Sequence, residues 1–129
     1  MQVVERAPVP ASDHREDRIL EALADPTMRA ILLALNERAQ PAPVIESELR
    51  MPHSSLYRKI HELKALGLLG VERVEITPQG KRVELLRALV SKVTVEMDGG
   101  RLSVRAMFRS LAEERARTMW SAIREEVRR

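Results

Sequence analysis

The chain contains no cysteine, three histidines, and one residue each of phenylalanine, tyrosine and tryptophan among its 129 residues. The absence of cysteine excludes disulfide bonds and thiolate metal or redox sites. The histidines, His14, His53 and His61, do not have the i, i+4 spacing with which two imidazoles share a metal ion on one helix. We therefore expect no metal and no cofactor, and a core built from aliphatic side chains.

Long apolar segments and catalytic motifs are missing as well. No run approaches the ~20 apolar residues of a membrane span, and the N-terminus has no apolar core of signal-peptide length, so we expect a cytoplasmic protein without a membrane partner. There is no glycine-rich phosphate loop, and no histidine stands in a convincing arrangement with a carboxylate or serine. Ser54 and Ser55 beside His53 are poor candidates, since neighbours on one helical turn do not converge on a substrate atom. The sequence therefore argues against an enzyme.

Positive charge is concentrated in the middle of the chain. Residues 1–49 hold 5 Lys and Arg against 9 Asp and Glu, residues 50–82 hold 7 against 3, and residues 83–129 hold 10 against 7. A polyanion would bind most readily over the central segment, although such an excess is also found on ordinary solvated surfaces.

Two helices are expected before this basic segment. The spacing of Ile19, Leu20 and Leu23 predicts the first helix, after an arm of residues 1–12 that carries two prolines and little periodicity. Asp25 and Pro26 mark the junction with a second helix, because Asp caps a helix and Pro fits its first position. The buried face of the second helix is expected to carry Met28, Ile31, Leu32 and Leu35.

A helix pair is predicted over residues 43–69. Its short first helix should bury Val44, Ile45 and Leu49, and its longer second helix has aliphatic residues on one side and hydroxyl, aromatic and cationic residues on much of the rest. Arg50 stands where a glycine is usual in such a turn, so an uncommon backbone geometry is one expectation for it. A helix held from behind by aliphatic residues, with a cationic outer edge, is suited to the DNA major groove, where Arg58 could donate two hydrogen bonds to a guanine. Tyr57 could contact DNA or could instead cover the seam between the two helices. The expected DNA-binding residues of this helix are His53, Ser54, Ser55, Tyr57, Arg58, Lys59, His61 and Lys64.

Two hairpins are predicted next. The turn of residues 77–80, Thr-Pro-Gln-Gly, joins two alternating segments into a basic wing, whose expected DNA-binding residues are Arg73, Gln79, Lys81 and Arg82. Residues 83–90 fit either a strand or a short helix, and we favour the strand. A second hairpin turns at Asp98, Gly99 and Gly100.

A helix from residue 106 to residue 127 is predicted at the end, with an apolar stripe too long to be buried in so small a domain. The stripe predicts a homodimer in which this helix packs on its symmetry mate or on the partner's body, unless it folds back across the first two helices. The expected interface residues are Phe108, Leu111, Ala112, Ala116, Met119, Trp120, Ile123 and Val127. A small-molecule effector bound where Met97, Met107, Phe108 and Trp120 cluster is a further hypothesis.

The segments LADPTMRAILLAL, SSLYRKIHELKALGLL and ITPQGKR resemble the ArsR-like winged helix-turn-helix transcriptional regulators, particularly small archaeal ones, over residues 15–105. The resemblance implies a dimeric transcription regulator with a recognition helix at residues 54–66 and a wing around residues 77–82. Members of the family that sense metals use cysteines, which this chain lacks, so metal sensing does not carry over.

The expected fold class is therefore α+β, mostly α: a winged helix-turn-helix with an additional β-hairpin and a long C-terminal dimerisation helix. Its parts are a flexible arm (1–12), a DNA-binding domain with the extra hairpin (13–105) and a dimerisation helix (106–129). The expected function is sequence-specific binding of double-stranded DNA. The alternative is a winged-helix module for protein contact within transcription or replication machinery.

Overall fold

The first two helices meet at the predicted Asp-Pro junction. The computed structural model describes residues 2–5 and 14–128, in which α1 spans His14–Ala24 and α2 spans Pro26–Glu37. The Asp25 carboxylate caps α2 by accepting hydrogen bonds from the backbone amides of Thr27 (2.8 Å) and Met28 (3.1 Å). Both helices turn aliphatic faces inward, including Ile19 of α1 and the four predicted positions of α2, Met28, Ile31, Leu32 and Leu35.

The segment between α2 and the next helix is fastened to a strand. Gln40 exchanges both backbone hydrogen bonds with Leu86, and its side-chain amide donates to the carbonyl oxygen of Ala34 at 3.1 Å. After this bridge, α3 spans Ala42–Leu49 and α4 spans His53–Ala65. Ile45 is buried as expected, but Val44 is exposed, so its predicted burial is wrong: in this two-turn helix Val44 points away from the core.

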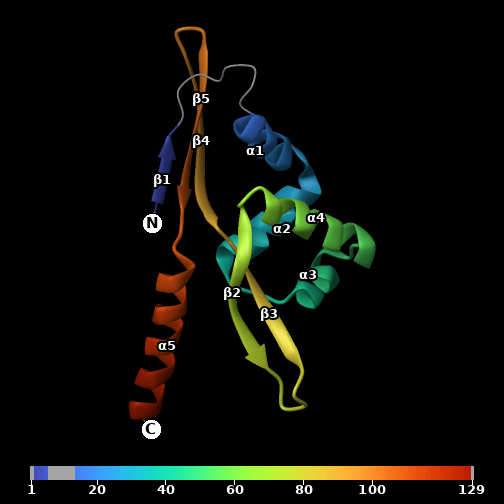
Figure 1. Ribbon diagram of the computed structural model, residues 1–129, viewed down its shortest axis with the longest axis vertical. Coiled ribbons are helices and arrows are strands. Elements are labelled where there is room, and N and C mark those ends of the chain that lie inside the picture. The colour runs from blue at the N-terminus through green and yellow to red at the C-terminus, as the bar shows by residue number, and fades with distance from the viewer. Residues whose placement is uncertain (1, 6–13, 129) are drawn as a thin grey trace.

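Two antiparallel sheets follow (Figure 1). The first consists of β2, Leu69–Ile76, and β3, Arg82–Ala88; the second has the order β1-β5-β4, with β1 at Gln2–Glu5, β4 at Val90–Asp98 and β5 at Arg101–Phe108. Residues 83–90 are thus extended, as favoured from the sequence. Leu89 joins the sheets, because its amide donates to the carbonyl of Leu68 and its carbonyl accepts from the amide of Arg109.

Strand β1 was not expected. Residues 1–12 were predicted to be a flexible arm, yet Gln2–Glu5 pair with β5 from Phe108 back to Arg105. That prediction is wrong for the strand, while the rest of the arm, residues 6–12, lies outside the described residues. A segment of four residues without an alternating pattern is too short for a strand to be predicted from the sequence. It forms a strand because it pairs with the free edge of β5.

The last helix, α5, begins later than predicted. It spans Leu111–Arg128, whereas the sequence suggested a start at residue 106. Ala106 is paired on both sides, with Val4 and with Val93, so β5 continues to Phe108 before the helix can start. The 18 residues of α5 correspond to a length of about 27 Å. In Figure 1, α5 and the β2–β3 hairpin project from the body toward the same end of the molecule, and the β4–β5 hairpin projects toward the other.

The hydrophobic core lies among α1 to α4 and the inner faces of the strands. It contains Leu56, Ile60 and Leu63 of α4 together with Leu68, Leu69 and Leu86, and has no buried aromatic residue among the described ones. Arginines tie the strands to the C-terminal end of α2: Arg87 donates to the carbonyl of Asn36 (3.1 Å), and Arg109 donates to its side-chain oxygen (2.8 Å). This packing holds the inner face of α4 and leaves its outer face uncovered.

Candidate nucleic-acid interface

The turn between α3 and α4 has the geometry of a helix-turn-helix although it lacks glycine. Arg50 takes the left-handed conformation at φ 52°, and its amide donates to the carbonyl of Glu46. Helix α4 begins three residues later, after Pro52. The expectation of an uncommon turn is therefore wrong: an arginine adopts the conformation that glycine usually supplies.

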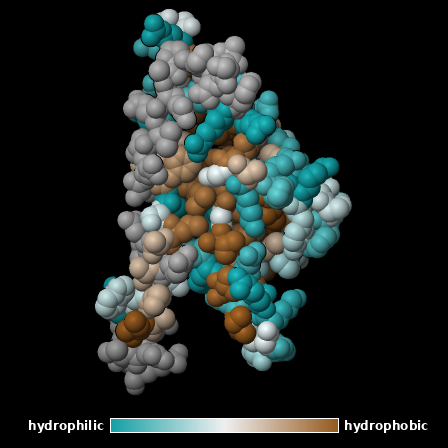
Figure 2. Space-filling view, in the orientation of Figure 1, coloured by the Kyte–Doolittle hydropathy of each residue, from teal (hydrophilic) through white to brown (hydrophobic). Residues whose placement is uncertain are grey.

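The outer surface of α4 carries several of the predicted contact residues. Ser54, Arg58 and His61 are exposed, and Leu56, Ile60 and Leu63 hold the opposite side in the core. Ser55 is half-buried beside them. In Figure 2 the surface over α3 and α4 is predominantly hydrophilic. The polar face of α4 is thus accessible along the helix.

Tyr57 lies on the flank of α4 that faces the wing. Its ring stacks on the imidazole of His53, with ring centroids 4.2 Å apart, and it is partly exposed. The Nδ1 atom of His53 lies 3.4 Å from the carboxylate of Glu46 on α3. His53 thus connects α4 to α3, and Tyr57 stacks on it while remaining partly exposed.

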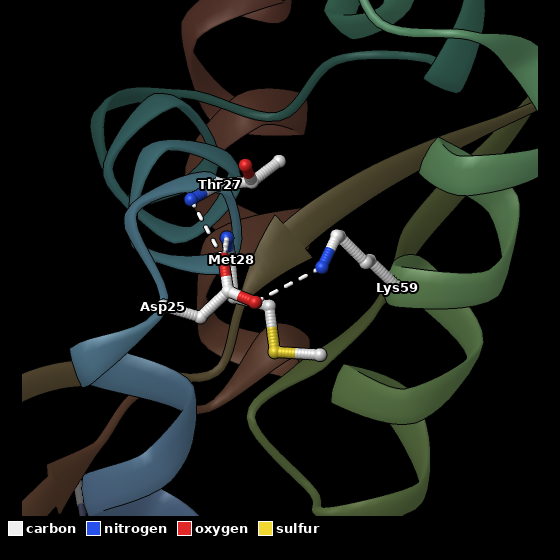
Figure 3. Close-up of polar contacts among 4 residues, drawn as sticks. All are labelled: Asp25, Thr27, Met28 and Lys59. Carbon is white, nitrogen blue, oxygen red and sulfur yellow. Dashed lines mark hydrogen bonds and ion pairs between the residues drawn. The ribbon is translucent and has the colours of Figure 1, made fainter.

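Lys59 does not lie where the sequence suggested. Its ammonium nitrogen is 3.0 Å from Oδ2 of Asp25, and its side chain is only 18% exposed (Figure 3). The side chain points back to the start of α2, whereas the sequence predicted a contact with DNA. The pKa of Asp25 is lowered below its ordinary value. The hydrogen bond from Lys59 has the largest effect, and the hydrogen bond from the Met28 amide has the next largest.

The wing is closed by hydrogen bonds within its turn. The amide of Thr77 donates to the carbonyl of Lys81 (2.8 Å), and the amide of Lys81 donates to the Thr77 hydroxyl (3.0 Å). Gln79, Lys81 and Arg82 are exposed, as expected for contacts with a ligand. Positive charge is therefore held at the tip of the β2–β3 hairpin.

Arg73, which was predicted as part of the wing, is paired with neighbouring carboxylates in β2. Its guanidinium is bonded to the carboxylates of Glu72 and Glu75, and Glu72 is buried. A β-bulge between Val71 and Arg73 brings these neighbours to one side. Arg73 is therefore engaged by two carboxylates of its own strand, and its contact with DNA stays a prediction.

A groove separates α4 from the wing. It has a volume of about 370 Å³ and is lined by Tyr57 and Lys64 of α4, Lys81, Arg82 and Glu84 of the wing, and prolines at the start of α3. Lys64 lies 4.0 Å from Glu84, a long ion pair between exposed side chains. The groove thus combines an apolar floor with cationic walls, and one carboxylate that the sequence did not single out.

The predicted stripe on α5 is only partly available for a partner. Trp120 and Met119 are each 61% exposed and Ile123 is 47% exposed, and Ala112 and Ala116 are also exposed. Figure 2 shows hydrophobic surface along the notch between α5 and the wing. The side chain of Val127 lies outside the described residues.

Phe108 and Leu111 are used within the chain instead. Phe108 belongs to β5, packs against the core and lies under the guanidinium of Arg15 at 5.8 Å. Leu111 is half-buried at the base of α5, where a Cβ built on Gly70 would lie 3.2 Å from its Cδ1 atom. Both side chains pack within the chain, and their place in a dimer interface stays a prediction.

The hypothetical effector cluster does not form. Met97 is 84% exposed near the end of the β4–β5 hairpin, whereas Trp120 lies on α5, which projects toward the opposite end (Figure 1).

The described residues contain no group of three or more His, Asp or Glu side chains that could hold a metal ion. No helix in the described part of the chain is long and apolar enough to cross a membrane.

Comparison with known proteins bears on the helix pair directly. A family described as "Helix-turn-helix domain" matches residues 23–72, which run from the end of α1 into β2. Residues 23–72 are thus similar to helix-turn-helix domains. With the β2–β3 hairpin directly after α4, this supports the resemblance to ArsR-like winged helix-turn-helix regulators that the sequence motifs indicate.

The helix-turn-helix domain and its flanking elements also have similar solved structures. HlyU from Vibrio cholerae is 17% identical with a TM-score of 0.43, over 84% of this chain and 88% of that chain. An ArsR family transcriptional regulator is 21% identical with a TM-score of 0.41, over 88% of this chain and 94% of that chain. No curated protein matches the chain.

Proposed function

We propose that this protein is a sequence-specific regulator of transcription that binds double-stranded DNA as a homodimer. In this proposal α4 enters the major groove, which is about 12 Å wide and accepts one α-helix. The observation that carries it is the exposed face of α4 within a helix-turn-helix domain: Ser54, Arg58 and His61 face solvent while the opposite face is fixed in the core.

Arg58 is the residue proposed to read a base. It is exposed, and among the described residues no salt bridge or hydrogen bond engages its guanidinium. A guanidinium can donate two parallel hydrogen bonds to O6 and N7 of guanine. Ser54 and His61, on the same face, are placed to contact neighbouring bases or phosphates.

The wing and the groove beside it are proposed to hold the DNA backbone. Lys81 and Arg82 line one side of the groove and Lys64 the other, so a phosphate entering it would meet cations from both. Gln79 extends this set at the tip of the turn. Contacts of this kind fix the register of the protein but carry no sequence information.

The dimer is proposed from α5. Monomeric soluble proteins rarely expose large contiguous apolar patches, and Met119, Trp120 and Ile123 are exposed on one helix. Pairing about a two-fold axis would cover the same stripe on both protomers. Two recognition helices would then contact half-sites about 34 Å apart, one turn of the duplex.

The test begins with selection of duplexes from a random pool by the wild-type protein. Affinity for the selected and for a random duplex is then measured for Arg58→Ala, for Lys81→Ala and for Arg101→Ala, a control that removes an exposed arginine from the far hairpin. We expect Arg58→Ala to weaken the selected duplex by about 1–3 kcal/mol per half-site and to relax preference at one base pair. Lys81→Ala should weaken both duplexes alike, and Arg101→Ala should change neither.

Salt dependence provides an independent check. If several phosphates are neutralised per protomer, the logarithmic slope of affinity against salt should be roughly −0.9 per phosphate. A protein-contact module would show no duplex shift at moderate salt, and that result would refute the proposed function.

A further inference from the structure

The ion pair between Asp25 and Lys59 joins the recognition helix to the helix behind it. Asp25 uses both carboxylate oxygens: Oδ1 accepts from the Thr27 and Met28 amides at the start of α2, and Oδ2 accepts from Lys59 at 3.0 Å (Figure 3). The two partners are 34 positions apart in the chain. A single carboxylate therefore caps the start of α2 and binds a side chain of α4.

This contact differs in kind from the rest of the packing of α4. Leu56, Ile60 and Leu63 hold the helix through aliphatic contacts, which depend on area and do not prescribe a direction. A charge-assisted hydrogen bond is directional and holds its two partners at a short, defined distance. Lys59 therefore limits how far α4 can turn about its own axis or slide along the core.

Arg58 precedes Lys59 by one position and points outward. Successive residues of an α-helix are separated by about 100° around the axis, so fixing Lys59 toward Asp25 also fixes the direction of Arg58. Lys59 is 18% exposed and Asp25 34% exposed, so the pair is partly shielded from water and salt.

We propose that Asp25 and Lys59 are positioning residues that set the orientation of α4 and thereby the sequence preference of the helix. This inference rests on the proposed function. It assigns Lys59 no contact with DNA, and it assigns Asp25, outside the helix-turn-helix pair itself, a role in specificity.

Three substitutions separate this role from others. Asp25→Ser is chosen over alanine because serine retains a good N-cap side chain, although it is too short to keep the bond to Lys59. Lys59→Met keeps the length of the side chain and removes its charge. Lys59→Arg keeps a cation that can still reach Asp25 and serves as the conservative rescue.

Affinity for selected and random duplexes is measured for each variant, far below its melting temperature and over a range of salt. We expect Asp25→Ser and Lys59→Met each to lower the preference for the selected duplex about tenfold, and the double variant to lower it no further. Binding to the random duplex should stay within about twofold, the salt slope of Lys59→Met should equal that of the wild type, and Lys59→Arg should restore most of the preference.

Other results overturn the proposal. A salt slope shallower by about one phosphate in Lys59→Met, with equal losses on both duplexes, would identify Lys59 as a direct backbone contact. If Asp25→Ser keeps the wild-type preference for the selected duplex but has a lower melting temperature, the ion pair contributes to stability and not to sequence preference. If the wild type itself selects no duplex, the proposed function fails and this inference with it; if the wild type selects a duplex and the variants keep the preference, only this inference fails.

Discussion

Replacing Trp120 with alanine is expected to dissociate the proposed dimer. Trp120 is 61% exposed, which on a side chain that buries ~200 Å² corresponds to roughly 120 Å² available to a partner. At about 25 cal/mol per Å², covering it contributes about 3 kcal/mol in each protomer. Because a two-fold interface contains the residue twice, the dimer should lose about 3–6 kcal/mol, a weakening of roughly 100-fold to 10⁴-fold.

The measurement is sedimentation equilibrium over a range of protein concentrations, with wild type, Trp120→Ala and Leu33→Ala side by side. Leu33 is 63% exposed on α2, so its substitution removes a comparably exposed apolar side chain from another part of the surface. Leu33→Ala should leave the association constant unchanged. The fold of each variant is checked by its unfolding midpoint, because removing an exposed side chain should alter stability little.

A second consequence concerns DNA. A monomer presents one α4, so Trp120→Ala should lose cooperative occupation of two half-sites while retaining weak binding to one. A dimer of undiminished strength in Trp120→Ala, or an equal loss in Leu33→Ala, would refute the assignment of the α5 stripe to the interface.

Three further predictions concern stability. Arg50→Gly should raise the free energy of unfolding by up to about 1 kcal/mol, because φ 52° strains an arginine but not a glycine; a lower urea midpoint would contradict this. The pKa of Asp25 is lowered from 3.8, so the stability that it contributes is present above pH 3.8 and is lost as pH falls through its folded value. The difference in unfolding free energy between wild type and Asp25→Ser should thus be constant from pH 7 to about 5 and shrink in stronger acid, and a difference that grows in acid would be inconsistent with the bond to Lys59. Gly70→Ala should lower the melting temperature, because its Cβ would lie 3.2 Å from Leu111, and an unchanged value would argue against the seating of α5 on β2.

Local signals in the sequence were sufficient for most of the recognition unit. The Asp-Pro junction, the aliphatic spacing in α4 and the Thr-Pro-Gln-Gly turn depend on neighbours within a few positions, and the structure has each of them. The second hairpin was similarly predicted from Asp98, Gly99 and Gly100 between alternating segments, and both glycines have a positive φ in the structure. These features are confirmed because backbone preference and periodicity act over one or two turns of chain.

The partners of individual side chains could be predicted less well from local sequence patterns. Lys59 and Arg73 were both assigned to DNA because they are cationic and lie near the right elements, but each has an anionic partner in the fold. For Arg73 the adjacent Glu72 and Glu75 were a signal that could have been used. For Lys59 there was no comparable signal, since Asp25 had already been explained as a helix cap.

The sequence by itself determined the order of helices and strands, the helix-turn-helix with its wing, and the cationic character of α4, because these follow from local spacing and residue type. Only the tertiary structure decided that β1 joins the sheet, that α5 starts at Leu111, and that Lys59 turns inward to Asp25. The reason is distance along the chain: a free strand edge, a shared carboxylate or a covered helix base exists only once segments far apart in sequence have packed together.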